Sequence, residues 1–288
     1  MHYIQCKTIL SANQGMNLYR GCSHGCIYCD SRCECYQMDH SFEDIAVKEN
    51  ALEVLELALM KKKKKTMIGM GAMSDPYMPL ENQLFYTRKA LQLALKYQYG
   101  ITLITKSNLV LRDLDLLKQI NQQTKCVIQM TLTTYDENLC KILEPHVCST
   151  KERFETLKIL HQAEIETVVW LTPILPFIND NLENLKGILD YCRQAHVKGI
   201  ICFDMGVTLR KGNREYFYQQ LDRYFPKMKE KYMKTYGEAY ILSSPHNQEL
   251  MDYFIKYCKK YHIMYDHQQI FAYLKHYEQK QFQQLQLF

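Results

Sequence analysis

Apolar segments of strand length alternate with amphipathic segments of helical length through most of this 288-residue chain. Five strand-like segments follow an N-terminal one, at 66–71, 101–105, 126–132, 167–172 and 199–203. Apolar residues recur at helical spacing between them, at 43–60, at 81–97 and after residues 110, 149 and 180. Six strands that alternate with helices predict a parallel sheet with right-handed crossovers. The predicted fold class is therefore α/β, a partial (β/α)6 barrel of the TIM type.

The end of the alternation divides the chain in two. Segments 213–224, 227–234 and 248–261 are predicted to be helices, and the strand–helix alternation ends except for a strand-like segment at 239–242. We therefore expect a barrel core at residues 1–205 and a helical C-terminal extension at 206–288 that covers the substrate side. Within the core, Ser149 and Glu152 have the spacing of a capping box, and Asp180 is predicted to cap the helix that follows it.

Three cysteines lie close together near the N-terminus, in the pattern C-x3-C-x2-C. They are Cys22, Cys26 and Cys29. Neighbouring thiolates suit a soft metal or an iron–sulfur cluster. A cluster iron normally has four ligands, so three protein sulfurs leave one iron open to a small molecule. The motif therefore predicts a cluster with one exchangeable position.

A closed metal site is the alternative to this interpretation. Structural zinc sites usually pair two separated C-x2-C knuckles, and the nearby additions here are Cys33 and Cys35. Either of these could complete a four-thiolate site in a non-catalytic iron–sulfur or zinc protein. We interpret Cys33, Cys35 and His24 as loop residues without direct metal contacts. Most of the other cysteines are expected to be small core residues, among them Cys126, Cys192, Cys202 and Cys258.

Polar residues follow the predicted strands. In an α/β barrel the loops after the strands converge on one face, where residues far apart in sequence meet. The cysteine loop and the residues at the other strand ends should therefore surround one cofactor. Those residues are Ser74 and Asp75 after the second strand, Lys106 and Ser107 after the third, Thr131 and Thr133 at the fourth, and Thr172 at the fifth.

The cysteine segment resembles the radical S-adenosylmethionine (SAM) superfamily, and residues 21–36 are most similar to the branch related to spore photoproduct lyase. The same order of similar segments continues through Ser74-Asp75-Pro76-Tyr77, Thr105-Lys106-Ser107, Glu144-Pro145 with Arg153, and Pro173 to Pro176. The resemblance implies a [4Fe–4S] cluster whose open iron is chelated by SAM. It also implies reductive cleavage of SAM to a 5'-deoxyadenosyl radical, with a flavodoxin or ferredoxin as electron donor.

The resemblance also implies roles for single residues. Lys106 looks like the lysine that holds the SAM carboxylate, Tyr28 like the aromatic residue beside the adenine, and Thr131 matches a SAM-contacting serine. Ser74 is suited to receive the amino group of SAM. One departure concerns the segment before Asp75, which reads Gly71-Ala72-Met73-Ser74. The lyase carries a hydrogen-donating cysteine there, so the same repair reaction is not expected.

The charge distribution leaves the substrate open. The net charge is +5, and the lysine run at 61–65, which is expected to end a helix, accounts for all of it. From residue 206 onward, 13 Lys and Arg face 8 Asp and Glu. Tyrosines lie among these cations, at Tyr216, Tyr218, Tyr224, Tyr232 and Tyr236. This region fits either a nucleic acid site or a helical cap packed on the barrel, and peptide and small-molecule substrates stay open.

The chain has no apolar run of the length that a membrane span requires, and it has no signal peptide. Twelve cysteines in such a chain are typical of reduced thiols. We therefore expect a cytoplasmic location and no membrane partner.

Overall fold

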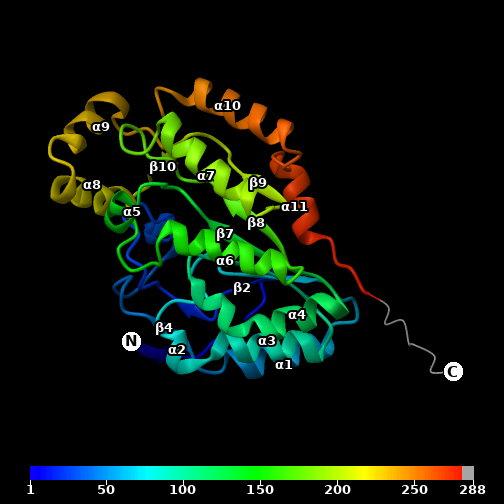
Figure 1. Ribbon diagram of the computed structural model, residues 1–288. Helices are drawn as coiled ribbons and strands as arrows, with labels where there is room; N and C mark the ends of the chain where they lie inside the picture. The colour runs from blue at the N-terminus through cyan, green and yellow to red at the C-terminus, as the bar shows by residue number, and fades with distance from the viewer. Residues whose placement is uncertain (281–288) are drawn as a thin grey trace.

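The central element is a sheet of six parallel strands, which the computed structural model shows within the described residues 1–280 (Figure 1). The strand order is β2–β5–β6–β7–β8–β9, and each neighbouring pair is parallel. The strands are β2 (Gly15–Met16), β5 (Met67–Met70), β6 (Gly100–Thr105), β7 (Cys126–Thr131), β8 (Glu166–Trp170) and β9 (Gly199–Ile201). The sequence prediction of a partial TIM-type barrel is confirmed.

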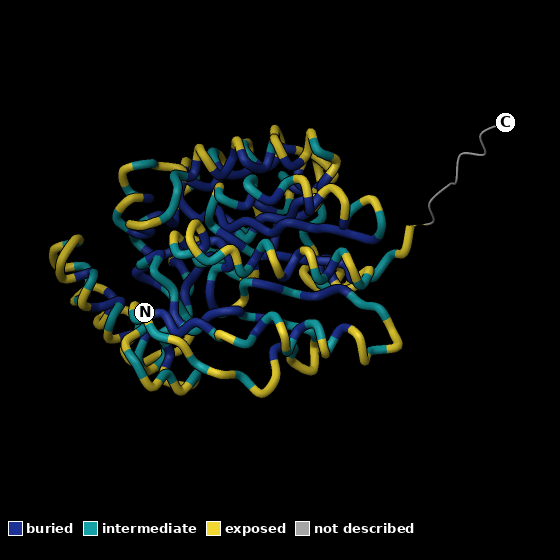
Figure 2. Tube along the Cα trace, turned by 90° about the horizontal axis from the view of Figure 1, so that it is seen from below, coloured by how far each residue is buried: buried dark blue, intermediate teal, exposed yellow. Residues whose placement is uncertain are grey.

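Helices connect these strands and cover the outside of the sheet. They are α1 (Ala51–Lys61), α2 (Glu81–Leu84), α3 (Tyr86–Lys96), α4 (Leu114–Gln123), α5 (Glu137–Leu143), α6 (Thr150–Gln162) and α7 (Leu182–Gln194). Short 3-10 helices are η1 (Asp30–Arg32), η2 (Glu34–Tyr36) and η3 (Asn108–Asp113). The outer faces of the helices carry the exposed residues, whereas the strands between them are buried (Figure 2). None of the described helices is both long and apolar enough to cross a membrane.

Two smaller sheets flank the barrel. One contains β1 (His2–Ile4), β4 (Ala46–Lys48) and β3 (Tyr19–Arg20), with β4 in the middle. The other is an antiparallel pair, β10 (Gly206–Thr208) and β11 (Ile241–Ser243). Helices α8 (Asn213–Tyr224) and α9 (Met228–Tyr236) lie between β10 and β11 in sequence, and α10 (Asn247–Lys260) and α11 (His267–Lys275) follow β11. Residues 281–288 of the expected C-terminal extension lie outside the described part.

The C-terminal helices pack in three places, of which one is the main core, where α10 contributes Leu250 and Phe254. Phe217, Leu221 and Tyr232 of α8 and α9 join a buried cluster with Cys26 and Ile27 of the cysteine loop. Ile270 and Leu274 of α11 pack instead on Val127, Val168 and Ile201 of the sheet. The α8–α9 pair therefore covers the cysteine loop, and α11 covers β7, β8 and β9.

Three helix predictions were wrong in a detail: one in its start, one in its continuity and one in its cap residue. The helix expected at 43–60 begins only at Ala51, because Ala46–Lys48 pairs with two strands as β4. The helix expected at 81–97 is broken by Phe85, whose φ of 56° is left-handed. The cap of α7 is Asn181 rather than Asp180, since the Asn181 side chain accepts a hydrogen bond from the backbone of Asn184. The capping box of Ser149 and Glu152 is confirmed.

Candidate active site

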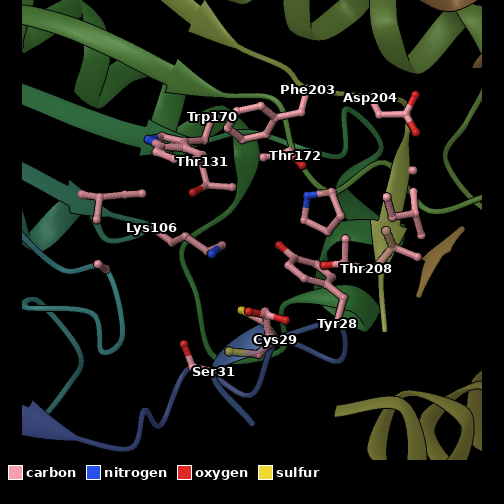
Figure 3. Close-up of a pocket in the computed structure, with 18 residues that line it drawn as sticks. Tyr28, Cys29, Ser31, Lys106, Thr131, Trp170, Thr172, Phe203, Asp204 and Thr208 are labelled. Carbon is pink, nitrogen blue, oxygen red and sulfur yellow. The ribbon is translucent and has the colours of Figure 1, made fainter. Parts of the chain in front are cut away.

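The carboxyl ends of the barrel strands open into a cavity of about 470 Å³ (Figure 3). A smaller cavity of about 130 Å³ adjoins it at the cysteine loop. All three predicted metal ligands, Cys22, Cys26 and Cys29, line the smaller cavity. The residues that line both cavities are Cys26, Cys29, Ser31, Ala72, Ile104, Lys106 and Thr131. The two cavities therefore share one wall, which the cysteine loop and the ends of β5, β6 and β7 build.

The electrostatics of the three thiols suit metal binding. Burial raises the pKa of Cys26 well above its ordinary value, and burial likewise raises the pKa of Cys29. Burial also raises the pKa of Cys22, but the hydrogen bond and charge of His24 outweigh it and lower the net value. Coordination supplies the positive charge that a buried thiolate lacks. The site therefore fits a metal cluster held by these three sulfurs.

Lys106 brings a half-buried positive charge to the same cavities. Burial lowers the pKa of its ammonium group, but the charges of Cys26, Glu144 and Cys29 outweigh burial and raise the net pKa. Its Nζ lies 5.8 Å from the centroid of the Tyr28 ring. In Figure 3 the side chain reaches into the cavity between Cys29 and Trp170. An ammonium group that faces a cavity in this way has the charge and the hydrogen-bond donors to bind a carboxylate.

Asp75 connects the loop after β5 to its neighbours. Its carboxylate accepts hydrogen bonds from Thr105 Oγ1 at 2.7 Å and from the backbone N–H groups of Lys106 and Tyr77, both at 2.8 Å. Its Oδ2 lies 3.3 Å from Nδ1 of the buried His24. Burial raises the pKa of Asp75, but the His24 charge and these hydrogen bonds lower it to about 2. Asp75 therefore fixes the positions of Lys106 and the cysteine loop.

His24 has a structural role that sequence reasoning missed. The residue is only 3% exposed, and its ring lies between Asp75 and Cys22. Burial lowers the pKa of His24, but the Asp75 charge raises it to about 10. In the sequence, His24 lies between cysteines, and no pattern there distinguishes a buried partner of Asp75 from an exposed loop residue. The signal comes only from the fold, which brings the loop after β5 against the cysteine loop.

Ser74 lines the smaller cavity with a hydroxyl group that has no protein partner. The residue is 4% exposed, and its Oγ makes no hydrogen bond to another described residue. A buried hydroxyl without a partner is unfavourable unless a ligand satisfies it. Ser74 therefore fits the polar contact that an amino group of a bound ligand would need.

Tyr28 is held by a buried network behind the cavity wall. Its hydroxyl donates to Glu144, which also forms an ion pair with Arg153 of α6. Arg153 Nη1 donates to the carbonyl oxygen of Thr131 at 2.8 Å. Burial raises the pKa of Glu144, but the charges of Arg153 and Lys106 outweigh it and lower the net value. The network therefore fixes the cysteine loop to the end of β7.

The remaining predicted site residues divide into two groups. Thr131 and Thr172 line the main cavity, as predicted from their places at strand ends. Ser107 and Thr133 lie outside both cavities. The Ser107 hydroxyl accepts from the Leu109 backbone at the start of η3, and Thr133 is fully buried beside Thr134.

The wall opposite the cysteine loop is aromatic, and sequence reasoning missed it. Trp170 ends β8, and Phe203 follows β9; both line the main cavity opposite Cys29 and Ser31 (Figure 3). Their ring centroids lie 6.2 Å apart, and Phe271 of α11 lies 6.1 Å from Trp170. Phe203 is 51% exposed. Their sequence signal is the same as that of Lys106, because both residues lie at or just after the end of a strand.

The indole of Trp170 is held in place from inside the barrel. Its Nε1 donates to Gln129 Oε1 at 2.8 Å, and Gln129 Nε2 donates to Thr102 Oγ1 at 2.7 Å. This chain of hydrogen bonds crosses β8, β7 and β6. The hydrogen bond uses only the indole N–H, so the ring of Trp170 can contact a ligand in the cavity.

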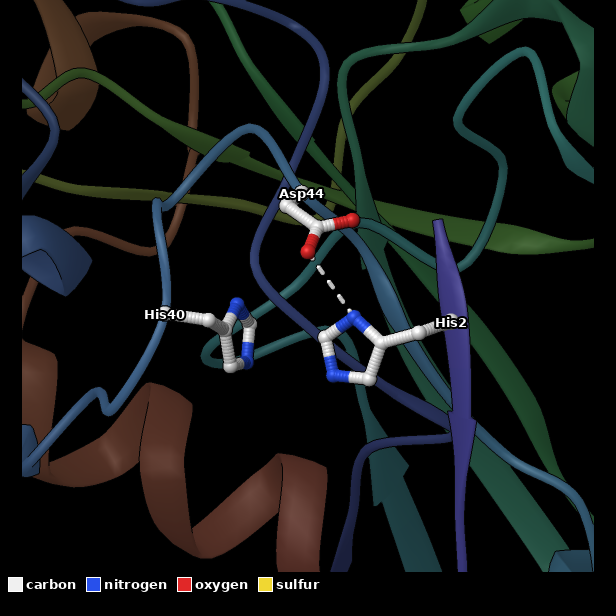
Figure 4. A group of neighbouring side chains, drawn as sticks. All are labelled: His2, His40 and Asp44. Carbon is white, nitrogen blue, oxygen red and sulfur yellow. Dashed lines mark hydrogen bonds and ion pairs between the residues drawn. The ribbon is translucent and has the colours of Figure 1, made fainter.

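A second group of metal-ligating side chains lies near the N-terminus. His2, His40 and Asp44 approach one another at the flanking sheet (Figure 4). His2 Nδ1 and Asp44 Oδ2 are 2.9 Å apart, and the other Asp44 oxygen lies 2.6 Å from the amino group of Met1. Both carboxylate oxygens are therefore already paired. We interpret the group as a contact that holds β1 against the segment before β4.

Residues 16–192 match the family model of the radical SAM superfamily. The chain belongs to the radical SAM superfamily. An uncharacterized protein of Mycobacterium tuberculosis is 25% identical over 281 residues, which cover 92% of this chain and 82% of the relative. An uncharacterized protein of Methanocaldococcus jannaschii is 32% identical over 174 residues, which cover 60% of this chain and 64% of the relative.

Solved structures of radical SAM enzymes have the same fold. A mutant of spore photoproduct lyase is similar with a TM-score of 0.63 and 16% identity, covering 91% of this chain and 78% of the lyase. The radical SAM methyltransferase TsrM of Kitasatospora setae is similar with a TM-score of 0.54 and 11% identity, covering 80% of this chain and 49% of TsrM. At these identities the likeness establishes the fold alone.

As a radical SAM enzyme, the protein has a [4Fe–4S] cluster and SAM as cofactors. The residues at the site fit both groups. Cys22, Cys26 and Cys29 supply three sulfurs in one cavity, and Lys106 and the unpaired hydroxyl of Ser74 face the same space. The cavity beside them has room for the nucleoside part of SAM and for a substrate.

Proposed function

We propose that this radical SAM enzyme abstracts a hydrogen atom from a substrate bound in the main cavity. When bound, the cluster and SAM supply the reactive species, a 5'-deoxyadenosyl radical released by reductive cleavage of SAM. The observation that carries the proposal is the arrangement of the cavities. Three sulfurs lie at one end, Lys106 lies between, and Trp170 and Phe203 form the far wall.

Each side chain has a proposed role in holding the cofactors. Lys106 binds the SAM carboxylate, Ser74 accepts a hydrogen bond from its amino group, and Tyr28 lies beside the adenine. Thr131 and Thr172 offer hydroxyl groups near the ribose. Asp75 acts indirectly by holding the backbone of Lys106. The aromatic wall of Trp170 and Phe203 excludes water from the reacting atoms.

We further propose a nucleic acid as the substrate. The support comes from Trp170 and Phe203, because bases stack on aromatic side chains. A similar solved structure is spore photoproduct lyase complexed with a dinucleoside spore photoproduct. The absence of a cysteine at Ala72 and Met73 argues against the lyase reaction itself.

The C-terminal region is proposed to be a cap rather than a base-stacking surface. Tyr232 is fully buried and donates to the carbonyl oxygen of Pro176, and Tyr236 donates to that of Ser243. Residues of β10 and β11 line the main cavity, among them Val207, Thr208 and Ile241. We therefore divide the chain after residue 205 into a barrel core and a cap that closes one side of the substrate cavity.

An external reductant completes the proposal. The expected donor is a flavodoxin or ferredoxin, as for other members of the superfamily. A cytoplasmic location is part of this proposal, as the twelve cysteines of the sequence led us to expect.

Anaerobic reconstitution tests the reaction. The protein is loaded with iron and sulfide, reduced with dithionite and supplied with SAM, and the products are separated by chromatography. We expect equal amounts of methionine and 5'-deoxyadenosine. Cys26→Ser should abolish both, whereas Cys6→Ser, at a cysteine outside both cavities, should not. A protein that binds a single zinc ion, or a cluster whose spectrum does not respond to SAM, would contradict the proposal.

Two further variants test the open coordination site. Cys33→Ala and Cys35→Ala should both retain the brown cluster, because the three-sulfur site does not use them. Loss of iron in either variant would favour a closed four-thiolate site and a non-catalytic role.

A further inference from the structure

The short helices after the cysteine loop bring a pair of thiols together at the protein surface. Cys33 and Cys35 flank Glu34 at the start of η2, and their Sγ atoms are 2.6 Å apart. Cys33 caps this helix, since its Sγ accepts a hydrogen bond from the Cys35 backbone N–H at 3.2 Å. This bond turns the Cys33 sulfur toward its neighbour. Neither residue lines the cavities that hold the three cluster cysteines.

The two thiols differ in their access to solvent. Cys33 is only 3% exposed, whereas Cys35 is an exposed residue. Burial and the hydrogen bond with Cys35 raise the pKa of Cys33. In thiol–disulfide exchange one sulfur must be reachable by a partner, and the second sulfur then displaces that partner. The exposed Cys35 is reachable by a partner, and the buried Cys33 lies where it can displace that partner.

Arg210 adds a positive charge beside the exposed sulfur. Its Nη1 lies 3.4 Å from Cys35 Sγ, and its Nη2 donates to Tyr240 at 2.6 Å, which holds the guanidinium in place. A cation in this place attracts an anionic disulfide such as oxidised glutathione to the exposed sulfur. The same guanidinium lies 3.9 Å from Asp30, which lines the main cavity. Arg210 therefore connects the thiol pair to the edge of the candidate active site.

We propose that Cys33 and Cys35 form a redox-active dithiol that exchanges with disulfides. The Cys35 thiolate attacks a disulfide of the glutathione class, R–S–S–R, and forms the mixed disulfide Cys35–S–S–R. The S–S bond of the partner breaks, and one R–S⁻ leaves and takes up a proton as R–SH. The Cys33 thiol then attacks Cys35 Sγ, forms the Cys33–Cys35 bond and releases the second thiol. The pair loses two electrons and two protons overall, and R–S–S–R becomes two R–SH. This function is independent of SAM cleavage and uses no cluster ligand.

The test is a redox titration of the cluster-loaded full chain under nitrogen. The protein is equilibrated in glutathione buffers from fully reduced to fully oxidised, quenched with acid and alkylated, and the thiols are quantified by peptide mass spectrometry. We expect Cys33 and Cys35 to lose alkylation together along one two-electron curve. The peptide that contains both residues should then carry an internal disulfide. In Cys148→Ser the curve should be unchanged.

Single variants distinguish the attacking thiol, Cys35, from the thiol that resolves the mixed disulfide, Cys33. In Cys33→Ala, Cys35 should accumulate as a glutathione mixed disulfide, because no second thiol resolves it. In Cys35→Ala, Cys33 should remain mostly alkylated at every ratio, since it is buried. Arg210→Gln should slow the exchange severalfold, and Arg210→Lys should restore most of the rate. The proposal is overturned if both thiols stay alkylated in oxidised glutathione, or if either alanine variant loses iron.

Discussion

Glu144 and Arg153 form an ion pair in which neither side chain is exposed. The pair lies directly behind Tyr28 and Thr131, so its loss should disturb both the fold and the cofactor cavity. Glu144→Gln leaves the Arg153 charge buried without its partner, and we expect a loss of about 3–5 kcal/mol in the free energy of unfolding. Urea denaturation at pH 7 measures the loss.

A surface pair provides the control for that variant. Glu155 and Lys158 are 48% and 39% exposed, and their ion pair spans one helical turn of α6. Glu155→Gln should cost at most about 1 kcal/mol, because solvent screens the pair. Equal losses in the two variants would show that burial of the Glu144 pair does not determine its contribution.

Glu43 gives a pH-dependent contribution at the residue scale. Burial raises its pKa, but Arg32, 2.6 Å away, outweighs burial and lowers the pKa below the ordinary 4.5. A depressed folded-state pKa contributes stability above the unfolded-state value, and this is lost as the pH falls through the folded-state value. Because Glu43 is 53% exposed, we expect Glu43→Gln to cost only about 0.5 kcal/mol at pH 7.

The pH series distinguishes this ion pair from a general effect of the substitution. The stability difference between wild type and Glu43→Gln should shrink as the pH falls below 4.5. Gln122→Ala, an exposed substitution in α4 that removes no titratable group, should show a difference that stays constant from pH 7 to pH 4. A Glu43→Gln difference that grows on acidification would contradict the predicted role of Arg32.

At the scale of elements, the turn before α8 is packed against the segment after the cysteine loop. Gly212 has a φ of 94°, and a Cβ atom there would lie 2.7 Å from the Arg32 carbonyl oxygen and 2.9 Å from the Glu34 nitrogen. Gly212→Ala should therefore cost about 1–3 kcal/mol in unfolding free energy. Because η1 directly follows Cys29, we also expect a lower iron content after reconstitution.

Gly237 is the matched control for backbone strain alone. It also has a positive φ, 53°, but a Cβ atom there would meet nothing within 4 Å. Gly237→Ala should lose some stability and keep the iron content of wild type. If both variants lose iron equally, the contact between the α8 turn and η1–η2 does not support the cluster loop.

The elements that sequence predicted correctly are those with local signals. Strands of the parallel sheet are continuous apolar runs, and the Ser149 capping box is set by residues three apart. The predicted start of the helix at 43–60 was wrong, because Ala46–Lys48 forms a strand instead. Its hydrogen bonds go to β1 and β3, which are remote in sequence. The pairing of His24 with Asp75 also depends on a remote contact. Tertiary contacts of this kind leave no periodic pattern in the chain.

At the scale of the whole molecule, the two ends of the cavity come from different halves of the barrel. The cysteine loop and the ends of β5 and β6 form the cofactor end. Trp170 at the end of β8 and Phe203 after β9 form the aromatic wall, and Phe271 of α11 packs against both rings. Lys106→Met should therefore weaken SAM binding, seen as a raised KM for SAM in the 5'-deoxyadenosine assay. The exposed Lys118→Met is the control and should leave KM unchanged.

The aromatic wall can be followed directly, because Trp170 is the single tryptophan of the chain. If a base stacks on the wall, single-stranded oligonucleotides should quench its fluorescence. Phe203→Ala should then weaken oligonucleotide binding by about 1–3 kcal/mol while 5'-deoxyadenosine formation persists. Tyr224→Ala, at an exposed tyrosine of α8, should leave the affinity unchanged. The reverse result, a loss with Tyr224→Ala and none with Phe203→Ala, would place nucleic acid on the C-terminal helices and leave the cavity for a smaller substrate.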